Sequence, residues 1–292
     1  MAAVPRLSIA MPAYNCEKYI GRALESLLAQ TYTDYELVIS DNASTDATEQ
    51  VCRSFAATDS RIRYVRRQDN IGGPGNFRYV FSLCRGEYHK WSTADDYWDP
   101  SFLAKCVPVL DQNPDVVLCY SKTKLIDAEG APIEDYEDNL DLGEESPRAR
   151  FGKLFSRIGL CNAHLGVIRR SAMRGTHLIG AERASDVHFL GELSLYGKFR
   201  LVPEFLFFRR YHQQSSSWNR GDVKHQNQYY DPKNTSHFGM HTWRKYRTLV
   251  SGVWHAPIGI GDKVGLSADL ARMSLWERER LARELVAPIR QG

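Results

Sequence analysis

Two neighbouring carboxylates, Asp95 and Asp96, are the residues of this chain best suited to carry chemistry. They follow residues 88–93, a short run rich in aromatic and β-branched side chains that is typical of a buried strand. Open α/β sheets bind ligands beyond the carboxyl ends of their strands, and Mg²⁺ is usually held by one or two carboxylates together with substrate phosphates. Adjacent acids before a helix also serve as turn and capping residues. The pair alone therefore leaves a metal site and a structural turn equally open.

Other polar clusters also follow predicted strands. The clusters are residues 12–15, residues 41–42 and the glycine-rich loop 70–76. The strands before them are residues 7–11, 35–39 and 61–65, and the segments between have apolar residues at helical spacing. This alternation of strand and helix predicts an α/β fold with a parallel sheet and helices on both faces. Because parallel strands end at one edge of a sheet, all four clusters should line a single cleft.

Local signals set the expected ends of these elements. Pro12 should stop the first strand, and Asp46 with Glu49 has the spacing of a capping box at a helix start. Asp99-Pro100 predicts the start of a further helix, which Pro108 should kink or end early.

Taken in order, the clusters form a series of short motifs. The motifs are Pro12-Ala13-Tyr14-Asn15 with Glu17, Asp41-Asn42-Ala43-Ser44-Thr45-Asp46, Asn70 with Gly72, Asn76-x-Arg78 and Ala94-Asp95-Asp96. Their order and spacing resemble the family 2 glycosyltransferases of the GT-A fold, from residue 7 to about residue 215. The resemblance implies a Rossmann-like, mostly parallel sheet and an inverting enzyme that uses a nucleotide-diphospho-sugar, with a UDP-sugar as the first choice. The acceptor would be a hydroxyl group in glycan, polysaccharide or glycolipid biosynthesis of the cell envelope.

The same resemblance implies roles for single residues in a donor site. The residues that would bind or support the nucleotide are Pro12, Tyr14, Asn15, Glu17, Asp41, Asn70, Asn76, Arg78 and Ala94. Asp95 would bind a ribose hydroxyl, and Asp96 would hold Mn²⁺ or Mg²⁺ against the diphosphate. Residues 209–215 resemble the late Arg-x-His-x-x-Ser segment of the family. Arg210, His212 and Ser215 would therefore reach the diphosphate, with His212 as a second metal ligand.

Asp186 is the candidate catalytic base. Ala184-Ser185-Asp186 stands where the family usually carries a pair of acids, with Ser185 in place of the first. The resemblance implies that Asp186 takes the proton of the acceptor hydroxyl. The structural alternative is that Asp186 is only the N-cap of a helix. In that case Glu182 and Glu192 would be the next candidates for the base.

The chain is expected to have three parts. Residues 1–215 form the predicted GT-A catalytic domain, with a nucleotide-sugar-binding half at 1–99 and an acceptor-binding half at 100–215. The acidic stretch 134–145 within the second half should be an exposed loop. Residues 216–237 form a polar linker, and residues 238–292 form a helical C-terminal region. Its mixture of basic and apolar residues fits an anionic membrane surface, a homo-oligomer contact or packing on the catalytic domain.

Composition limits the alternatives. A net charge of +3 over 292 residues argues against a nucleic acid partner. The six cysteines have no CxxC spacing, so we expect reduced core thiols and no metal cluster. With no signal segment and no apolar run of membrane-spanning length, we expect a cytoplasmic protein with at most peripheral membrane contact.

Two other functions stay open at this point. One is a sugar-nucleotide nucleotidyltransferase, and the other is a non-catalytic sugar-nucleotide-binding protein. The first would need basic residues in a glycine-rich loop after the first strand, whereas here no Lys or Arg stands between Pro12 and Lys18.

Overall fold

The first part of the chain repeats a strand–helix unit in the computed structural model, which describes residues 4–213, 229–230, 232 and 240–286. Its elements are β1 (Leu7–Ala13), α1 (Glu17–Leu28), β2 (Tyr35–Asp41), α2 (Thr48–Thr58), β3 (Ile62–Arg66), α3 (Gly73–Leu83) and β4 (Tyr88–Trp91). β1 lies between β2 and β4, and all of its pairings are parallel, as is that of β2 with β3. The carboxyl ends of these strands therefore meet at one edge of the sheet, as predicted.

The second part extends the sheet with strands that run in both directions. Its elements are β5 (Tyr97–Trp98), α4 (Phe102–Gln112), β6 (Val116–Ile126), β7 (Pro132–Tyr136), α5 (Pro147–Arg157), the 3₁₀ helix η1 (Asn162–Leu165), β8 (Val167–Arg169), α6 (Arg170–Met173), α7 (Ser185–Leu193) and β9 (Lys198–Arg210). The strand order is β3-β2-β1-β4-β8-β6-β9-β5, and β7 pairs with β6. β8 is antiparallel to both β4 and β6, whereas β6 and β9 are parallel. The predicted GT-A type of α/β fold is confirmed, and its parallel order is concentrated in β1–β4, within the half predicted to bind the nucleotide-sugar.

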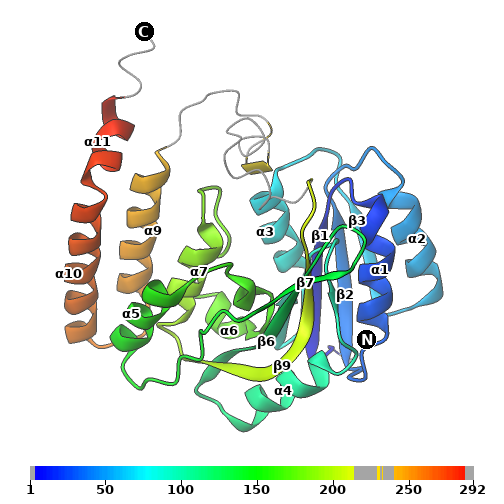
Figure 1. Ribbon diagram of the computed structural model, residues 1–292, viewed down its shortest axis with the longest axis horizontal. Helices are drawn as coiled ribbons and strands as arrows, with labels where there is room; N and C mark the ends of the chain where they lie inside the picture. The colour runs from blue at the N-terminus through cyan, green and yellow to red at the C-terminus, as the bar shows by residue number, and fades with distance from the viewer. Residues whose placement is uncertain (1–3, 214–228, 231, 233–239, 287–292) are drawn as a thin grey trace.

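Helices cover both faces of the sheet. In Figure 1, α1 and α2 lie on one side of β1 and β2, and α3 lies on the other. β2 is buried at every residue, and in β1 only Pro12 is not fully buried. Burial on both faces explains why these strands are continuous apolar runs rather than alternating patterns.

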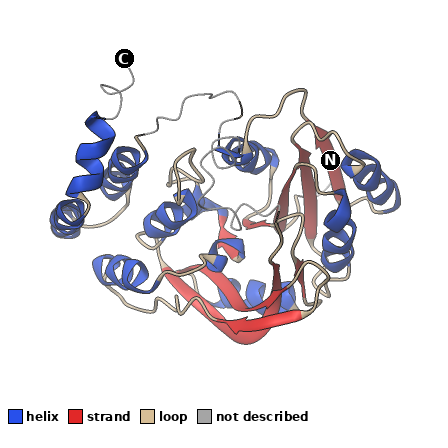
Figure 2. Ribbon diagram, turned by 45° about the horizontal axis from the view of Figure 1, so that its top comes forward, coloured by secondary structure: helices blue, strands red, loops and turns tan. Residues whose placement is uncertain are grey.

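The described C-terminal residues form α9 (His241–His255), α10 (Ile260–Trp276) and α11 (Arg278–Val286), so the predicted helical region is confirmed. These helices lie together at the end of the molecule remote from β3 (Figures 1 and 2). α9 packs against α7, and Leu249 and Val253 of α9 share an apolar cluster with Phe151 and Leu195. Within the described residues, no helix has both the length and the hydropathy that a membrane span requires.

Some element ends differ from the predictions. β1 continues one residue beyond Pro12, because β4 pairs only with Leu7–Ala10 and Pro12 lies past the end of that neighbouring strand. α2 does not begin with the predicted capping box. Glu49 forms an ion pair with Arg66 instead of reaching back to Asp46, whose own carboxylate accepts a hydrogen bond from the Thr48 N–H.

The region after β4 needs two more corrections. α4 begins at Phe102 rather than Pro100, because Asp99 Oδ1 accepts hydrogen bonds from the backbone N–H and hydroxyl of Ser101 before the helix starts. Pro108 lies inside α4 without ending it, since a buried face on both sides of the proline packs the helix against β6. Residues 134–145 are only partly an exposed loop: β7 pairs with β6 up to Tyr136, and both leucines that follow it, Leu140 and Leu142, are buried.

Candidate active site

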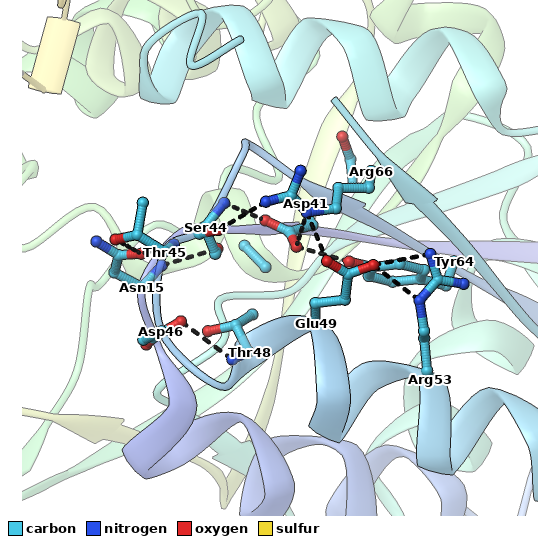
Figure 3. Close-up of polar contacts among 12 residues, drawn as sticks. Asn15, Asp41, Ser44, Thr45, Asp46, Thr48, Glu49, Arg53, Tyr64 and Arg66 are labelled. Carbon is cyan, nitrogen blue, oxygen red and sulfur yellow. Dashed lines mark hydrogen bonds and ion pairs between the residues drawn. The ribbon is translucent and has the colours of Figure 1, made fainter. Parts of the chain in front are cut away.

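Asp41 ends β2 at the edge where the parallel strands finish, and its side chain is fully buried. Its Oδ1 accepts a hydrogen bond from the Ser44 N–H at 2.8 Å, and its Oδ2 accepts one from the Tyr64 hydroxyl at 2.6 Å. Arg66 Nε lies 3.7 Å from the same Oδ2 (Figure 3). Burial, together with this hydrogen bond to the carboxylate, raises the pKa of Tyr64. Both oxygens of Asp41 therefore shape the loop after β2.

The loop after β1 is fastened to the loop after β2 by two of the predicted donor residues. Asn15, which has a φ of 45°, accepts a hydrogen bond from the Thr45 N–H at 2.8 Å (Figure 3). Glu17 Oε2 accepts one from the Ala47 N–H at 2.7 Å. These bonds order both loops. Tyr14, which precedes Asn15 in the first loop, is 47% exposed, and Pro12 at the end of β1 is half-buried. A flat apolar surface is thus held at the rim of the predicted cleft.

The glycine-rich loop joins the same edge through side-chain amides. Asn70 Oδ1 accepts hydrogen bonds from Asn42 Nδ2 and from the Gly72 N–H, both at 2.8 Å. Asn76 is only 2% exposed and donates to the Ser40 carbonyl at 2.8 Å, which ties α3 to β2. Arg78 lies on the exposed side of α3, opposite Asn76. The structure therefore brings Asn70 and Asn76 to the edge, and the role of the exposed Arg78 stays a prediction.

The acidic pair divides into an inward and an outward carboxylate. Asp96 is 4% exposed and accepts hydrogen bonds from the Arg210 N–H at 2.7 Å and from the Thr93 hydroxyl. Burial, with a smaller contribution from the neighbouring Asp95, raises the pKa of Asp96 to about 7. The side chain of Asp95 is 25% exposed, and its Oδ2 lies 2.9 Å from His212 Nε2.

The outward acid is not the one that we predicted as the metal ligand. The sequence interpretation paired Asp96 with His212, whereas the structure places Asp95 against His212. Asp96 points inward because its oxygens satisfy Arg210 and Thr93, and the buried Ala94 holds the turn against the core. The ribose contact that we predicted for Asp95 stays a prediction.

Arg209 and Arg210 point to opposite faces of β9, as neighbouring strand residues do. Arg210 is buried, and its Nε and Nη1 donate to the carbonyls of Asp95 and Ala128 at 3.0 and 2.9 Å. Its guanidinium therefore braces the acidic turn, which differs from the predicted contact with a diphosphate. Arg209 Nη1 donates to the Leu160 carbonyl at 2.9 Å on the other face. Ser215, the last predicted residue of this segment, lies outside the described residues.

Asp186 lies in the first turn of α7 and is half-buried. The N-cap of α7 is Ala184, with a φ of 58°, so Asp186 does not have the capping position that the structural alternative required. Glu192 is 1% exposed and accepts hydrogen bonds from the backbone and ring of His177. Glu182 lies 3.6 Å from His188. Of the three candidate bases, Asp186 is the one for which the described residues show no ion pair within 4.0 Å, although the imidazole of His164 lies nearby.

Two residues beside Asp186 were missed by the sequence interpretation. Cys161 precedes η1 and has a φ of 64°, and His164 lies within η1. The Cys161 sulfur, a His164 ring nitrogen and an Asp186 oxygen lie within 4.8 Å of one another. Burial raises the pKa of the Cys161 thiol and lowers the pKa of His164. The six cysteines are free thiols, as predicted, but spacing along the chain could not show that one of them faces Asp186.

Lys90 of β4 contacts η1, the 3₁₀ helix that carries His164. Its side chain is fully buried in β4, and Nζ donates to the Leu165 carbonyl at 3.0 Å and lies 3.7 Å from the centre of the Trp98 ring. Burial lowers the pKa of Lys90 well below its ordinary value. The apolar pattern of the predicted strand did not indicate that a lysine within it is buried and holds η1 next to β4.

A cavity of about 870 Å³ has His212 in its lining. Its lining includes the aromatic side chains of Tyr19, Tyr136 and Tyr211 and the carboxylates of Asp127 and Glu134. The predicted nucleotide loops do not line it. Most of the lining comes from residues 125–213, the part of the chain predicted to bind the acceptor.

The sequence profile of the family described as "Glycosyl transferase family 2" matches residues 8–174. Among curated proteins, an Escherichia coli chondroitin synthase is 30% identical over 229 residues, which cover 77% of this chain and 32% of that protein. An uncharacterized Mycobacterium tuberculosis protein is 40% identical over 133 residues, which cover 44% of this chain and 38% of that protein. The chain thus spans about a third of the length of these relatives.

Solved structures with the same fold include S. aureus TarS in complex with UDP-GlcNAc, with a TM-score of 0.66 and 16% identity over 91% of this chain and 71% of that one. A second is the mannosyltransferase PcManGT from Pyrobaculum calidifontis in complex with GDP-Man and Mn²⁺. Its TM-score is 0.55 and its identity 18%, over 97% of this chain and 85% of that one. At these identities the likeness concerns the fold.

Proposed function

The chain belongs to glycosyl transferase family 2, and we propose that it transfers a sugar from a nucleotide-diphosphate donor to a hydroxyl acceptor with inversion at the anomeric carbon. The observation that carries this proposal is the placement of two different acids. Asp95 with His212 lies at the end of the parallel strands, and Asp186 lies beside Cys161 and His164 of the segment that Lys90 holds against β4. One position suits the leaving diphosphate and the other suits the attacking hydroxyl.

A UDP-sugar is our proposed donor. The exposed ring of Tyr14 would supply the flat surface that a pyrimidine base needs, and the buried Asp41 would support the loop beside it through the Ser44 N–H. Two structures of similar fold contain nucleotide ligands, UDP-GlcNAc in TarS and GDP-Man in PcManGT, which supports a nucleotide-sugar donor in general. Because the chain is similar to bacterial chondroitin and hyaluronan synthases, we propose a glycan or a lipid-linked sugar as the acceptor.

We assign a divalent cation to Asp95 and His212. A partly exposed carboxylate oxygen and an imidazole nitrogen 2.9 Å apart form a donor set that suits Mn²⁺ or Mg²⁺, with the diphosphate supplying further oxygens. When bound, the cation would neutralise the charge that develops on the departing diphosphate. Arg210 and Asp96 contribute indirectly, because they fix the turn that presents Asp95.

Asp186 is the proposed general base. Direct displacement requires a proton to leave the acceptor hydroxyl as its oxygen attacks the anomeric carbon, and a carboxylate within hydrogen-bond reach can take that proton. Asp186 is half-buried in the first turn of α7, so part of its carboxylate is accessible to an acceptor.

The test is a transfer assay with UDP-sugars, Mn²⁺ and short oligosaccharide acceptors, with the anomeric configuration of the product read by NMR. An α-linked donor should give a β-linked product. Retention of configuration would contradict the direct displacement. Release of pyrophosphate from UTP and a sugar phosphate would instead support the nucleotidyltransferase, and donor binding without any turnover would support a sugar-nucleotide-binding protein.

The C-terminal helices are our proposed contact with an anionic membrane that carries a lipid-linked acceptor. Trp243, Arg247, Val250 and Trp254 are exposed and follow one another at helical spacing on α9. Tryptophan and arginine side chains on one face of a helix suit the boundary between lipid headgroups and water.

A further inference from the structure

Cys161, His164 and Asp186 provide three side chains with metal-binding atoms within 4.8 Å of one another. Cys161 is buried, whereas His164 and Asp186 are half-buried, so the cluster has a closed inner side and an open outer side. The proposed transfer reaction uses only Asp186. A role for the thiol and the imidazole is therefore still to be explained.

The backbone fixes the tautomer of the His164 imidazole. His164 Nδ1 lies 2.5 Å from the Cys161 carbonyl oxygen, so the ring donates its Nδ1–H to that oxygen. The lone pair of the neutral ring is then on Nε2. Histidines that bind metals usually have this same bond from the other ring nitrogen to a backbone carbonyl or a carboxylate.

The position of the thiol is imposed by the surrounding loop. Cys161 has a φ of 64°, a left-handed conformation that costs energy for a residue other than glycine. Contacts on both sides of it maintain that conformation. Arg209 Nη1 donates to the Leu160 carbonyl at 2.9 Å, and Asp138 Oδ2 accepts a hydrogen bond from the Ala163 N–H at 2.7 Å. The strain therefore lies at the residue whose side chain faces His164 and Asp186.

We propose that Cys161, His164 and Asp186 form a Zn²⁺ site with an open fourth position. One thiolate, one imidazole and one carboxylate match the ligands that zinc prefers, whereas Mg²⁺ and Mn²⁺ favour oxygen. Thiolate and carboxylate together neutralise the cation, and the thiol proton leaves to solvent as the metal binds. Ligand atoms of a tetrahedral zinc site are about 3.5 Å apart. Side-chain rotations that shorten the present separations by roughly 1 Å would complete the site.

The consequence is zinc inhibition, and this part rests on the proposed function. A zinc ion would occupy the Asp186 oxygen that must accept the proton of the acceptor hydroxyl. Zinc should therefore compete with the acceptor and leave binding of the donor at Asp95 and His212 unaffected. The two sites of the chain would then select different metals by their ligand chemistry.

Cobalt provides a test that does not depend on turnover. The metal-free full chain is titrated with Co²⁺, and the absorbance of a thiolate-to-cobalt charge-transfer band is recorded, followed by displacement with Zn²⁺. We expect a band that saturates at one equivalent in the parent and disappears in Cys161→Ser. His164→Gln and Asp186→Asn keep the thiol and should weaken binding about 10–100-fold.

Cys16→Ser is the matched control, because Cys16 is the half-buried cysteine elsewhere in the chain and contacts Thr48. It should retain the band, as should Asp95→Asn. Absence of the band in the folded parent, or a band that survives Cys161→Ser, would overturn the zinc site. Normal sugar transfer with no cobalt band would reject the site and leave the proposed function intact, whereas a band without transfer would do the reverse.

Discussion

The edge that we propose for the donor and the side that we propose for the acceptor are built in different ways. The loops after β1, β2 and β3 follow one another in a repeated strand–helix order, and their side chains hold each other through short hydrogen bonds. The acceptor side joins η1 to α7 across the mixed part of the sheet. Non-glycine residues with positive φ occur in both places, at Asn15 and Ala43 in the first and at Cys161, Leu178 and Ala184 in the second. The proposed donor edge follows from the repeated parallel topology, whereas the proposed acceptor side depends on contacts between distant segments of the chain.

This difference suggests a division of labour. A rigid, extensively hydrogen-bonded edge is suited to a ligand that every member of a family shares. A side assembled from distant segments can vary with the acceptor. Substitutions at the two places should therefore have different effects: donor binding and transfer should be lost together at one, and transfer alone at the other.

The substitution with the largest expected effect, at Asp186, should change sugar transfer without changing donor binding. Asp186→Asn should reduce transfer by at least about 10²-fold, because an amide cannot take the acceptor's proton. Binding of the donor, measured by calorimetry, should remain at the parental level. The fold should also persist, since Asp186 is not the N-cap of α7. An Asn variant that transfers sugar at the parental rate would remove Asp186 from the mechanism.

The next prediction concerns stability at the donor edge. Asp96 has a pKa raised from 3.8 to about 7 by burial. The unfolded chain therefore ionises Asp96 at a lower pH than the folded chain, and folding loses free energy as the pH rises through that window. Asp96→Asn keeps the acceptor for the Arg210 N–H and removes the titration. In EDTA, the melting temperature of Asp96→Asn should increase relative to that of the parent as the pH rises from 3.8 to about 7.

Asp135→Asn controls for the loss of one charge, because Asp135 is exposed on β7 and pairs with Lys124. Melting curves that shift in parallel with pH for the parent and Asp96→Asn would show that Asp96 is ionised in the folded protein. Its inward position would then need a different explanation.

The sequence predicted the donor edge better than the acceptor side, for a physical reason. Strand ends, glycines and amides are local signals, and parallel topology alone brings Asp41, Asn70 and Asp95 to one edge. Which acid of the pair points outward depends on the Arg210 N–H of β9, a contact between distant parts of the chain. The placement of Cys161 and His164 beside Asp186 likewise depends on Arg209, Lys90 and the mixed strands, none of which has a periodic signature.

The smallest expected effect lies outside both regions. If α9 contacts an anionic membrane, Trp254→Ser should lower co-flotation with anionic vesicles at low salt by roughly several-fold, because it removes buried apolar area from the interface. Ile133→Ser is the matched control, since Ile133 is exposed on β7, away from α9. No co-flotation of the parent would reject the membrane contact, and a concentration-dependent mass in light scattering would favour a homo-oligomer.

The central claim is that Asp95 with His212, and not Asp96, binds the cation that holds the donor diphosphate. Calorimetry of UDP binding with and without Mn²⁺ tests it most directly in the parent, Asp95→Asn and Asp96→Asn. The account predicts that Mn²⁺ strengthens UDP binding by the parent. That strengthening should be smaller by a factor of at least roughly 10 in Asp95→Asn, and it should be reduced less in His212→Ala. Asp96→Asn should keep most of it. Mn²⁺-dependent binding that survives in Asp95→Asn and is lost in Asp96→Asn would contradict the account.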